Sequence, residues 1–345
     1  MDHLGRDMLW AAADSTAWDE IDKAVAAEVA RIRVGQKVFP TVQMPDAPNV
    51  SLDQFNPQTM TIDEGLTSPF VEISLAFALT RSQVDNEASL RKARTLALLA
   101  AKTHAQSEDE IFFQGNQAPS FVNNQFPGLL TFTNINSAGR GLLGLVNANQ
   151  VIVVVRPPAP GGAPGAPAPG APAPGGAAPG APAPGAPAPG GAAPGAAARR
   201  RAGGAAGAPA AGAVPPAGGY GSATFDGVVR GIALLISLGH PGPFALFLST
   251  EIYADTYQTV GATQTTTAER ITPLVTDGFY GTGSLPAATG LLVSLGGEPT
   301  TIYIAQDAVA AFTQEDPGGI YRFRVFERVQ IVNRDARALV RLDFQ

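Results

Sequence analysis

Few side chains in this sequence could act as an acid, a base or a nucleophile, and the histidines are the first to consider. His3 lies close to the first residue, His104 lies in an expected helix beside Lys102 and near Glu108, and His240 lies in a Gly-His-Pro-Gly turn. An imidazole changes its charge near neutral pH, so it can serve as a general acid, a general base or a metal ligand. We expect His104 to be solvated or to cap a groove, and we assign a catalytic role to none of the three.

Three consecutive carboxylates, Glu108, Asp109 and Glu110, could supply metal ligands, and together with His104 they resemble half of a di-metal site. The helical motif of di-iron carboxylate proteins requires Glu-x-x-His on paired helices. That spacing does not occur in this sequence. We therefore expect a solvated helix face, with Glu110 available for an ion pair, and no metal site.

Other patterns of catalytic residues are also missing from the sequence. Residues 278–283 read Gly-Phe-Tyr-Gly-Thr-Gly, which matches neither a GxxxxGK phosphate loop nor a GxGxxG dinucleotide motif, and we expect turn glycines there. No GxSxG nucleophile elbow occurs. The absence of cysteine excludes disulfides, thiolate metal sites and cysteine nucleophiles. The sequence predicts no catalytic residue and no cofactor, and it does not support an enzyme.

An interruption of biased composition divides the chain. Residues 157–219 contain almost nothing but Pro, Ala and Gly, and one unit of 15 residues occurs twice, at 165–179 and 180–194. Glycine recurs there every five residues, whereas a collagen triple helix needs it at every third position. Such a segment cannot bury enough apolar area to offset the entropy of ordering it. We therefore predict a disordered insertion that protrudes into solvent.

The charge and hydropathy of the chain limit its partners. The net charge is −6, and four of the basic side chains are Arg156 and Arg199–Arg201, in or beside the insertion. A surface that binds nucleic acid needs a cationic field, so we expect no nucleic-acid partner. The sequence contains no run of 18 apolar residues, the length that a membrane-spanning helix requires. The apolar cluster Met8–Trp10 is too short for the core of a signal peptide. We expect a soluble, cytoplasmic protein with no membrane partner.

The periodicity of the two flanks predicts an α+β protein with more than one lobe. Helices are expected at 16–34, 87–114, 225–238 and 251–258, and strands at 70–79, 244–248, 290–295, 301–305, 320–331 and 338–344. The apolar residues expected to face the core are Trp18, Ile21, Val25, Val29 and Ile32 in the first helix and Leu90, Leu98, Ala101, Ala105 and Phe112 in the second. Repeated proline in residues 39–70 excludes a central strand and indicates an exposed arm.

Several of these segments resemble, in order, those of encapsulins, the bacterial nanocompartment shell proteins. The matching segments are Trp18–Asp22 in a helix that ends at Gly35, Ser68–Ile73 with Val84–Asn86, Glu108–Gly115 with Pro127–Leu130, Gly242–Leu248, and Phe323–Glu327 with Ala338–Leu342. Together they extend over nearly all residues outside the insertion. The resemblance implies the HK97-type phage capsid fold, which has a peripheral lobe, an axial lobe and an extended arm.

The resemblance also implies boundaries for these parts. It assigns 1–38 to an N-terminal helix and cargo-groove segment, 39–69 to the extended arm, 70–136 and 300–345 to the peripheral domain, 137–156 and 220–299 to the axial domain, and 157–219 to the disordered insertion. A lumenal groove for a cargo targeting peptide would include Ile32, Val38 and Phe39. A loop around a fivefold pore would include Thr263, Gln264, Thr265 and Thr266.

This chain departs from the family pattern at two places. Related shells commonly have Gly-Arg-Lys followed by Asp after the first helix, whereas residues 35–40 read Gly-Gln-Lys-Val-Phe-Pro, so a more apolar groove is expected. Some relatives stack a flavin on a Trp near the start of the long helix. Ser82 occupies the corresponding place here, so we expect no flavin by that route.

The resemblance implies a function and leaves alternatives open. The leading hypothesis is a self-assembling icosahedral shell of the smallest class that encloses a cargo protein carrying a targeting peptide and admits small solutes through pores. One alternative is a prophage major capsid protein that packages DNA. Another is a soluble enzyme whose two flanks fold independently on either side of a linker, whereas a shell protein would form one discontinuous fold.

Overall fold

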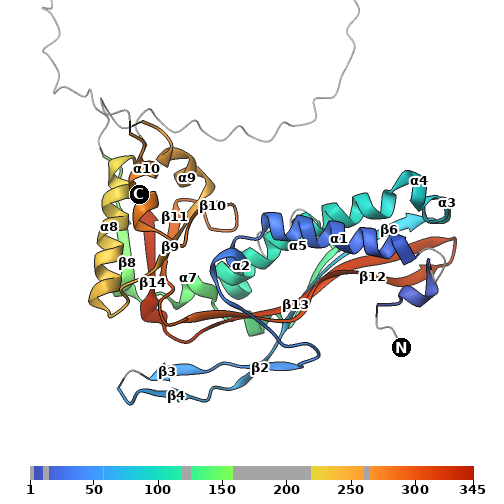
Figure 1. Cartoon of the computed structure of the whole chain (residues 1–345), viewed down its shortest axis with the longest axis horizontal. Helices are drawn as coiled ribbons and strands as arrows, with labels where there is room; N and C mark the ends of the chain where they lie inside the picture. Colours follow the sequence, from blue (N-terminus) through green and yellow to red (C-terminus); the bar gives the residue numbers. More distant parts are fainter. Residues whose placement is uncertain (1–3, 11–14, 57, 119–125, 158–218, 260–264) are drawn as a thin grey trace, which may run out of the picture. The chain divides into compact units, whose positions relative to one another are not determined.

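The computed structural model describes residues 4–10, 15–56, 58–118, 126–157, 219–259 and 265–345 (Figure 1). Both flanks of the insertion belong to one structural unit. This is expected of a single discontinuous fold, whereas flanks that fold independently would form two units. The disorder predicted for the insertion concerns residues 158–218, which lie outside the described residues.

The first sheet is built on a long antiparallel hairpin of β12 (Thr300–Asp316) and β13 (Ile320–Asn333). Its strand order is β1-β12-β13-β6-β7, with β1 (Thr41–Gln43), β6 (Val71–Thr80) and β7 (Leu130–Thr133). Among the described pairs of this sheet, β1 and β12 run parallel and all the others run antiparallel. β12 is much longer than the expected strand 301–305. Bulges after Ile304 and Gln306 interrupt the alternation of its side chains, so the sequence pattern breaks off there, but the pairing with β13 continues.

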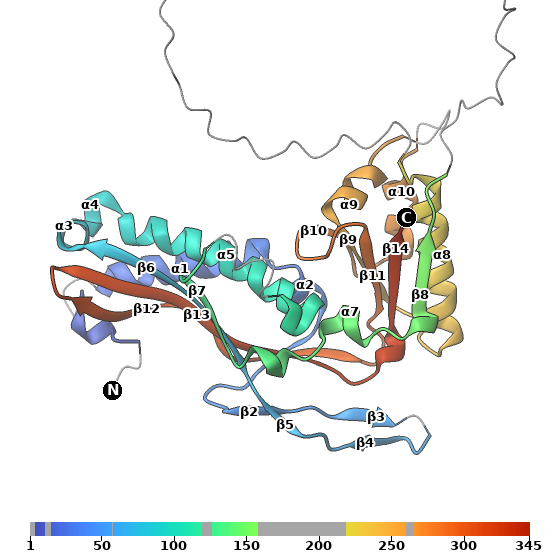
Figure 2. The ribbon, with the colours of Figure 1, turned by 180° about the vertical axis from the view of Figure 1, so that it is seen from behind.

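Two helices, α1 (Ser15–Ile32) and α5 (Lys92–Gln114), lie side by side on this sheet (Figures 1 and 2). The stripe expected in the first helix is confirmed, since Trp18, Ile21 and Val25 are buried. These residues recur at intervals of three and four, which places them on one helical face. The helix therefore packs through the face that its sequence predicts.

The expected helix over 87–114 is interrupted by Arg91, whose φ of 49° is left-handed. α4 (Glu87–Leu90) precedes the break and α5 follows it. The carboxylate of Glu87 accepts hydrogen bonds from the backbone N–H groups of Ala93 (2.7 Å) and Arg94 (3.0 Å). Glu87 therefore satisfies the free amides at the start of α5, which is the reason that a new helix begins there.

The second sheet has the strand order β10-β9-β11-β14-β8. Its strands are β8 (Val151–Val154), β9 (Phe244–Ser249), β10 (Gly278–Thr282), β11 (Thr289–Ser294) and β14 (Leu339–Phe344), and α8 (Ser222–Ser237) packs against it. The turn expected at 278–283 is wrong, because five of these residues form β10 in parallel with β9. β14 joins this sheet as well, where it pairs with β11 and β8, and the boundaries expected for the domains stay a prediction.

The proline-punctuated segment forms an extended antiparallel hairpin. β2 (Asn49–Ser51) pairs with β5 (Thr67–Pro69), and further out β3 (Gln54–Asn56) pairs with β4 (Thr61–Asp63). At the base, Val50 and Phe70 pack with Val332 of β13.

The remaining short elements are η1 (Arg6–Met8), α2 (Gly35–Val38), α3 (Arg81–Asp85), η2 (Gly115–Gln117), η3 (Ile135–Ala138), α7 (Gly141–Leu145), η4 (Ala148–Gln150), α9 (Thr250–Thr256), α10 (Thr267–Ile271), η5 (Thr272–Leu274) and η6 (Ala336–Ala338). Within the described part of the chain, no helix is both long and apolar enough to cross a membrane.

Candidate functional site

The residues expected to form a groove separate in the structure. Ile32 ends α1 and Val38 ends α2, and both side chains are half-buried. Phe39 is only 2% exposed, and its ring stacks on that of Phe247 at 5.9 Å between centroids. Its side chain belongs to the core between the two sheets, and a role of Phe39 in a cargo groove stays a prediction.

A cleft of about 400 Å³ lies beside Ile32. We call it the α5 cleft, and it is lined by Ile32, Val34, Gln106, Asp109, Glu110, Gly281, Thr282, Gly283 and Ser284. Three distant parts of the chain meet there: the end of α1, the middle of α5 and the segment that follows β10. Of the expected groove residues, the α5 cleft includes Ile32 and excludes Val38 and Phe39.

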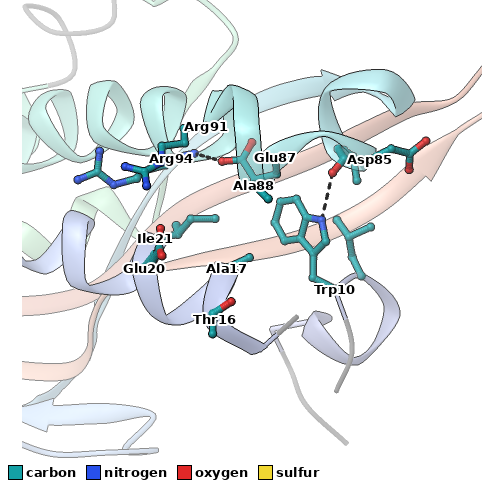
Figure 3. Close-up of a pocket in the computed structure, with 12 residues that line it drawn as sticks. Trp10, Thr16, Ala17, Glu20, Ile21, Asp85, Glu87, Ala88, Arg91 and Arg94 are labelled. Carbon is teal, nitrogen blue, oxygen red and sulfur yellow. Dashed lines mark hydrogen bonds between the residues drawn. The ribbon is translucent and has the colours of Figure 1, made fainter. Parts of the chain in front are cut away.

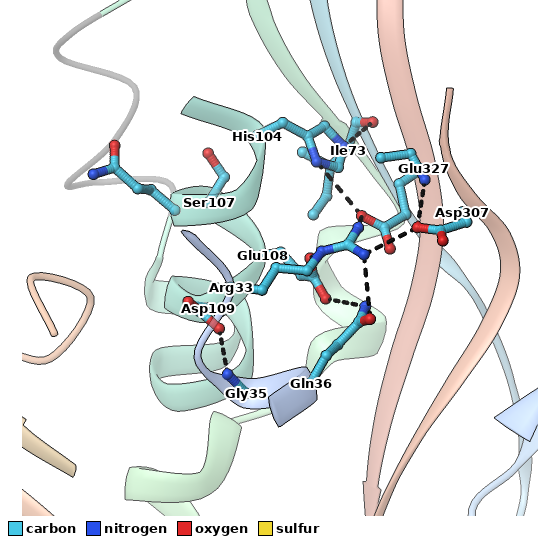
Figure 4. A network of polar contacts seen from close by, with 12 residues as sticks. Arg33, Gly35, Gln36, Ile73, His104, Ser107, Glu108, Asp109, Asp307 and Glu327 are labelled. Carbon is cyan, nitrogen blue, oxygen red and sulfur yellow. Dashed lines mark hydrogen bonds and ion pairs between the residues drawn. The ribbon is translucent and has the colours of Figure 1, made fainter. Parts of the chain in front are cut away.

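The backbone after α1 is fixed to α5 by Asp109. Its carboxylate accepts hydrogen bonds from the N–H groups of Val34 (2.9 Å) and Gly35 (2.8 Å) (Figure 4). A Cβ at Gly35 would lie 2.8 Å from Cδ2 of Phe112 and 3.2 Å from Oδ1 of Asp109. Glycine is therefore required here by the close approach of this backbone to α5.

The side chain of Arg33 is the centre of a buried charge network (Figure 4). Its guanidinium pairs with Glu108 of α5, with Glu327 of β13 at 2.6 Å and with Asp307 of β12 at 3.0 Å. Gln36 joins the network by donating a hydrogen bond to Glu108 (2.6 Å). One arginine therefore connects the N-terminal segment to a helix and to two strands.

His104 is completely buried beside this network, so the expectation of a solvated histidine is wrong. Its Nε2 lies 3.3 Å from the carbonyl oxygen of Ile73, and its Nδ1 lies 3.5 Å from Glu327. Burial and the nearby Arg33 guanidinium lower the pKa of His104 to about 3. The imidazole is therefore neutral at physiological pH, with Nε2–H as the donor to Ile73.

The three consecutive acidic residues are also buried, which corrects the expected solvated face. Burial is the main cause that raises the pKa of Asp109 to about 7 and that of Glu110 to about 8. The pKa values of Glu108 and Glu327 are raised by burial as well. Within the described residues, no three His, Cys, Asp or Glu side chains are placed to hold a metal ion. The network is a structural connection between segments.

The sequence analysis missed Arg33, Asp307 and Glu327. A signal for Glu327 is present in β13, because it shares the alternation of Phe323, Val325 and Val329, all of which are buried. Residues two apart in a strand lie on the same face. A carboxylate at a core-facing position requires a buried partner, although the sequence does not identify that partner as Arg33.

A second cavity, of about 470 Å³, lies between the first turns of α1 and the segment from α3 to α5 (Figure 3). Trp10 lines it and donates a hydrogen bond from its indole N–H to the carbonyl of Val84 (3.2 Å). Arg91 and Arg94 lie on the opposite side. Ser82, where the expectation of no flavin was placed, is an exposed residue of α3.

The expected pore loop is described only in part. Thr263 and Gln264 lie outside the described residues, and Thr265 is exposed. Thr266 caps α10: its hydroxyl accepts a hydrogen bond from the N–H of Glu269 (3.2 Å), and the Glu269 carboxylate accepts one from the N–H of Thr266 (2.9 Å). This reciprocal cap fixes the end of the loop, and the role at a pore stays a prediction.

The remaining histidines have no geometry suited to catalysis in the described residues. His3 lies outside them. His240 is largely buried, with Nε2 at 3.4 Å from Asp335, whose carboxylate also pairs with Arg337 at 2.6 Å. These contacts join the turn after α8 to the turn after β13.

Comparison with known proteins finds similarity to encapsulating proteins over part of the chain. Residues 211–330 match the family model described as "Encapsulating protein for peroxidase". The type 1 encapsulin shell protein EncA of Myxococcus xanthus (strain DK1622) is 32% identical over 88 residues, which are 26% of this chain and 31% of that protein. The aligned stretch therefore spans less than a third of the relative's length.

Solved structures show the fold. A virus-like particle from Pyrococcus furiosus has a TM-score of 0.58 at 9% identity, covering 94% of this chain and 99% of the other. The capsid of an empty GTA particle has a TM-score of 0.50 at 14% identity, covering 90% and 89%. The mixed α+β, HK97 capsid-like fold predicted from the sequence is confirmed. Over part of its sequence the chain is therefore similar to encapsulin shell proteins, and its fold is HK97 capsid-like.

Proposed function

We propose that this chain assembles into a closed icosahedral shell that encloses a cargo protein. The observation that carries the proposal is the match of residues 211–330 to a family of encapsulating proteins, on a chain with a capsid-like fold. A shell subunit functions in contact with copies of itself, and most homo-oligomers form closed, symmetric assemblies.

The hairpin arm supports assembly because it exposes apolar side chains that a lone subunit leaves in water. Met60 is 79% exposed, Ile62 61% and Leu66 85%; Met60 and Ile62 lie in the outer part of the hairpin, and Leu66 precedes β5. A cluster of exposed apolar residues marks an interaction surface. A neighbouring copy of the chain would cover it.

The domain roles follow the same proposal. The first sheet with α1 and α5 would form the peripheral lobe, the second sheet with α8 would form the axial lobe, and residues 39–69 would form the arm. The loop that contains Thr265 and Thr266 would lie at a fivefold pore that admits small solutes. We place the shell in the cytoplasm. We assign it to the smallest icosahedral class because the arm is short.

Cargo would enter through a targeting peptide that binds at the N-terminal segment. Ile32 supports this placement because it is half-buried and lines the α5 cleft, and the half-buried Val38 ends the next short helix, α2. The net charge of the chain supports a protein rather than DNA as the content of the shell. A net charge of −6 would repel a packaged polyanion.

Negative-stain microscopy of the purified full chain tests the proposal. We expect uniform hollow particles with no nuclease-protected nucleic acid inside. Small monodisperse particles would contradict shell formation. Particles that retain protected DNA would favour the capsid alternative.

A further inference from the structure

Two tyrosine hydroxyls meet at the end of α9. Tyr253 lies in α9, and Tyr257 caps the C-terminal end of this helix. Their hydroxyl oxygens are 2.8 Å apart, and their ring centroids are 5.2 Å apart at an interplanar angle of 66°. The chain has six tyrosines, and in the part that the structure describes no other two of them have rings in contact. This pair is therefore the place where one tyrosine can react with another in the same chain.

The ring of Tyr253 is held in position by β10, which lies beside α9 (Figure 1). The ring of Phe279 in β10 packs against it with 5.1 Å between the centroids. Gly281 lies two residues further along the strand and so on the same face. A Cβ at Gly281 would overlap the Tyr253 ring. The missing side chain therefore leaves the space in which one member of the pair is fixed.

Tyr257 is the accessible member of the pair. It is 53% exposed, whereas Tyr253 is half-buried. The ring contact and the side-chain hydrogen bond of Tyr257 are both with Tyr253. An exposed side chain changes its rotamer on the picosecond to nanosecond timescale. The ring of Tyr257 can therefore meet an oxidant in solution and can also turn toward the fixed ring of Tyr253.

The contact between the two hydroxyls persists at physiological pH. The hydrogen bond with Tyr257 is the main cause that raises the pKa of Tyr253 to about 12, and burial adds to it. The Tyr253 hydroxyl therefore keeps its proton. A phenoxyl radical formed on Tyr257 can take a proton and an electron from Tyr253 across this hydrogen bond. The exposed ring is then ready to be oxidised a second time, so both rings can become radicals although only one is well exposed.

We propose that Tyr253 and Tyr257 are an oxidative modification site, where a one-electron oxidant of the haem peroxidase class, supplied with hydrogen peroxide, joins the two rings as an intrachain dityrosine. Each phenol loses one proton and one electron and becomes a phenoxyl radical. The radicals combine through a bond between two ring carbons ortho to the hydroxyls, and the hydrogen on each of these carbons moves to the oxygen of its ring. The two protons and two electrons reduce one hydrogen peroxide to two water molecules.

The geometry of the pair suits this product. Side chains four residues apart on a helix have Cβ atoms about 5–6 Å apart, so the two rings extend from neighbouring points of the backbone. A bond ortho to both hydroxyls keeps the two hydroxyls adjacent, as they already are. The bond would fasten to α9 the start of the segment in which Thr259 and Thr266 form an antiparallel bridge. The chemistry does not depend on shell formation.

Oxidation of the purified full chain by a haem peroxidase and hydrogen peroxide tests the site, with dityrosine detected by its fluorescence. The natural protein is compared with Tyr253→Phe and with Tyr321→Phe on a denaturing gel. Tyr321 is the control, because its ring contacts Phe312 and no tyrosine. We expect equal fluorescence in the single-chain band for the natural protein and Tyr321→Phe. We expect its loss for Tyr253→Phe, although the exposed Tyr257 remains.

Mass spectrometry of the natural protein locates the bond without any variant. Trypsin leaves both tyrosines in one peptide, 231–270, because no lysine or arginine lies between Arg230 and Arg270. We expect this peptide to become lighter by two hydrogen atoms, with no fragments from cleavage between positions 253 and 257. An unchanged mass would overturn the proposal. Undiminished single-chain fluorescence of Tyr253→Phe, or dityrosine found only between chains, would overturn it as well.

Discussion

Arg33 and Glu327 lie 294 positions apart in the sequence, yet the guanidinium Nη2 and the carboxylate Oε2 are 2.6 Å apart in the protein interior. Arg33 follows α1, and Glu327 lies on the core-facing side of β13. Because Arg33 also pairs with Glu108, this contact fastens the N-terminal segment to the sheet and to α5 at one point. The placement of the α5 cleft depends on that connection.

Removing the arginine should destabilise the subunit strongly. Arg33→Leu leaves Glu108 and Glu327 buried without their cation, which costs about 3–5 kcal/mol. Arg31→Leu is the matched control, because Arg31 is exposed and a surface ion pair such as that with Glu28 contributes little to stability. Differential scanning fluorimetry should show a melting temperature lower by roughly 6–15 °C for Arg33→Leu and almost unchanged for Arg31→Leu. Equal melting temperatures for the two variants would contradict the network.

Stability should fall as the pH rises from about 6.5 to 8.5. Burial raises the folded-state pKa of Asp109 to about 7 and of Glu110 to about 8, so the folded state holds protons that the unfolded state has released. Their stabilising contribution is complete at acid pH and is lost as the pH passes through the folded values. His104 acts below this window, because its pKa is lowered to about 3 and an unfolded histidine is neutral above about 6.5.

Glu110→Gln tests this dependence because it removes one of the titrating groups and keeps the shape of the side chain. We expect its melting temperature to fall less between pH 6.5 and 8.5 than that of the natural protein. Glu251→Gln should retain the full dependence, because Glu251 is an exposed residue of α9. A natural protein whose melting temperature is constant or rises over this range would contradict the raised pKa values.

A methyl group at Gly35 should disturb the contact between the N-terminal segment and α5. The Cβ of Gly35→Ala would meet the Phe112 ring at 2.8 Å, and overpacking of this kind costs about 1–3 kcal/mol. Gly283→Ala is the control, because its Cβ would meet nothing closer than the Thr250 hydroxyl at 3.9 Å. Melting curves should separate the two variants by several degrees. A Gly35→Ala protein as stable as Gly283→Ala would show that the backbone moves aside freely.

Shortening the hairpin arm should separate folding from assembly. Deletion of the whole segment 41–66 would also remove β1 from the first sheet and the buried Val50. Replacing 54–63 with a tight Asn-Gly turn removes only β3 and β4, whose ends Gln54 and Asp63 are paired. We expect a folded subunit by circular dichroism and no closed particles by negative stain. Normal particles from this variant would show that the outer arm has no role in assembly.

Trimming the insertion should leave the shell intact. Loop closure depends on the logarithm of length, so replacing 157–219 with a short Gly-Ser turn should change stability by only about 1–2 kcal/mol, in the favourable direction. Dynamic light scattering should report particles of smaller hydrodynamic radius. In the full chain, trypsin should cut at Arg199–Arg201 first if the insertion faces outward. Resistance there until the particles are dismantled would place it inside.

The sequence predicted the elements that depend on local periodicity. α1 has the expected face because large apolar residues such as Trp18 and Val25 recur at helical spacing. The stripe assigned to α5 was partly wrong: Leu90 is exposed, whereas His104 and Glu108 are buried. In a helix rich in alanine the small side chains allow close packing on any side, and distant partners decide which polar groups are buried.

The site was less predictable because its parts come from distant segments. Ile32 lines a cleft, but the wall opposite it is supplied by residues 281–284, which no local pattern connects with Ile32. The burial of Phe39 depends on its contact with Phe247, which no local pattern indicates. Glu110 was expected in solvent because three adjacent acidic residues normally face water. Its burial follows from the packing of α1 and of the segment after β10 against α5.

The mass of the purified particle tests shell formation most directly. A closed shell of the smallest icosahedral class contains sixty copies of the 35.4 kDa chain, so mass photometry of cargo-free protein should show one dominant species of roughly 2.1 MDa. A dominant species near the mass of one or a few chains, under conditions in which the protein is folded, would contradict the proposed shell.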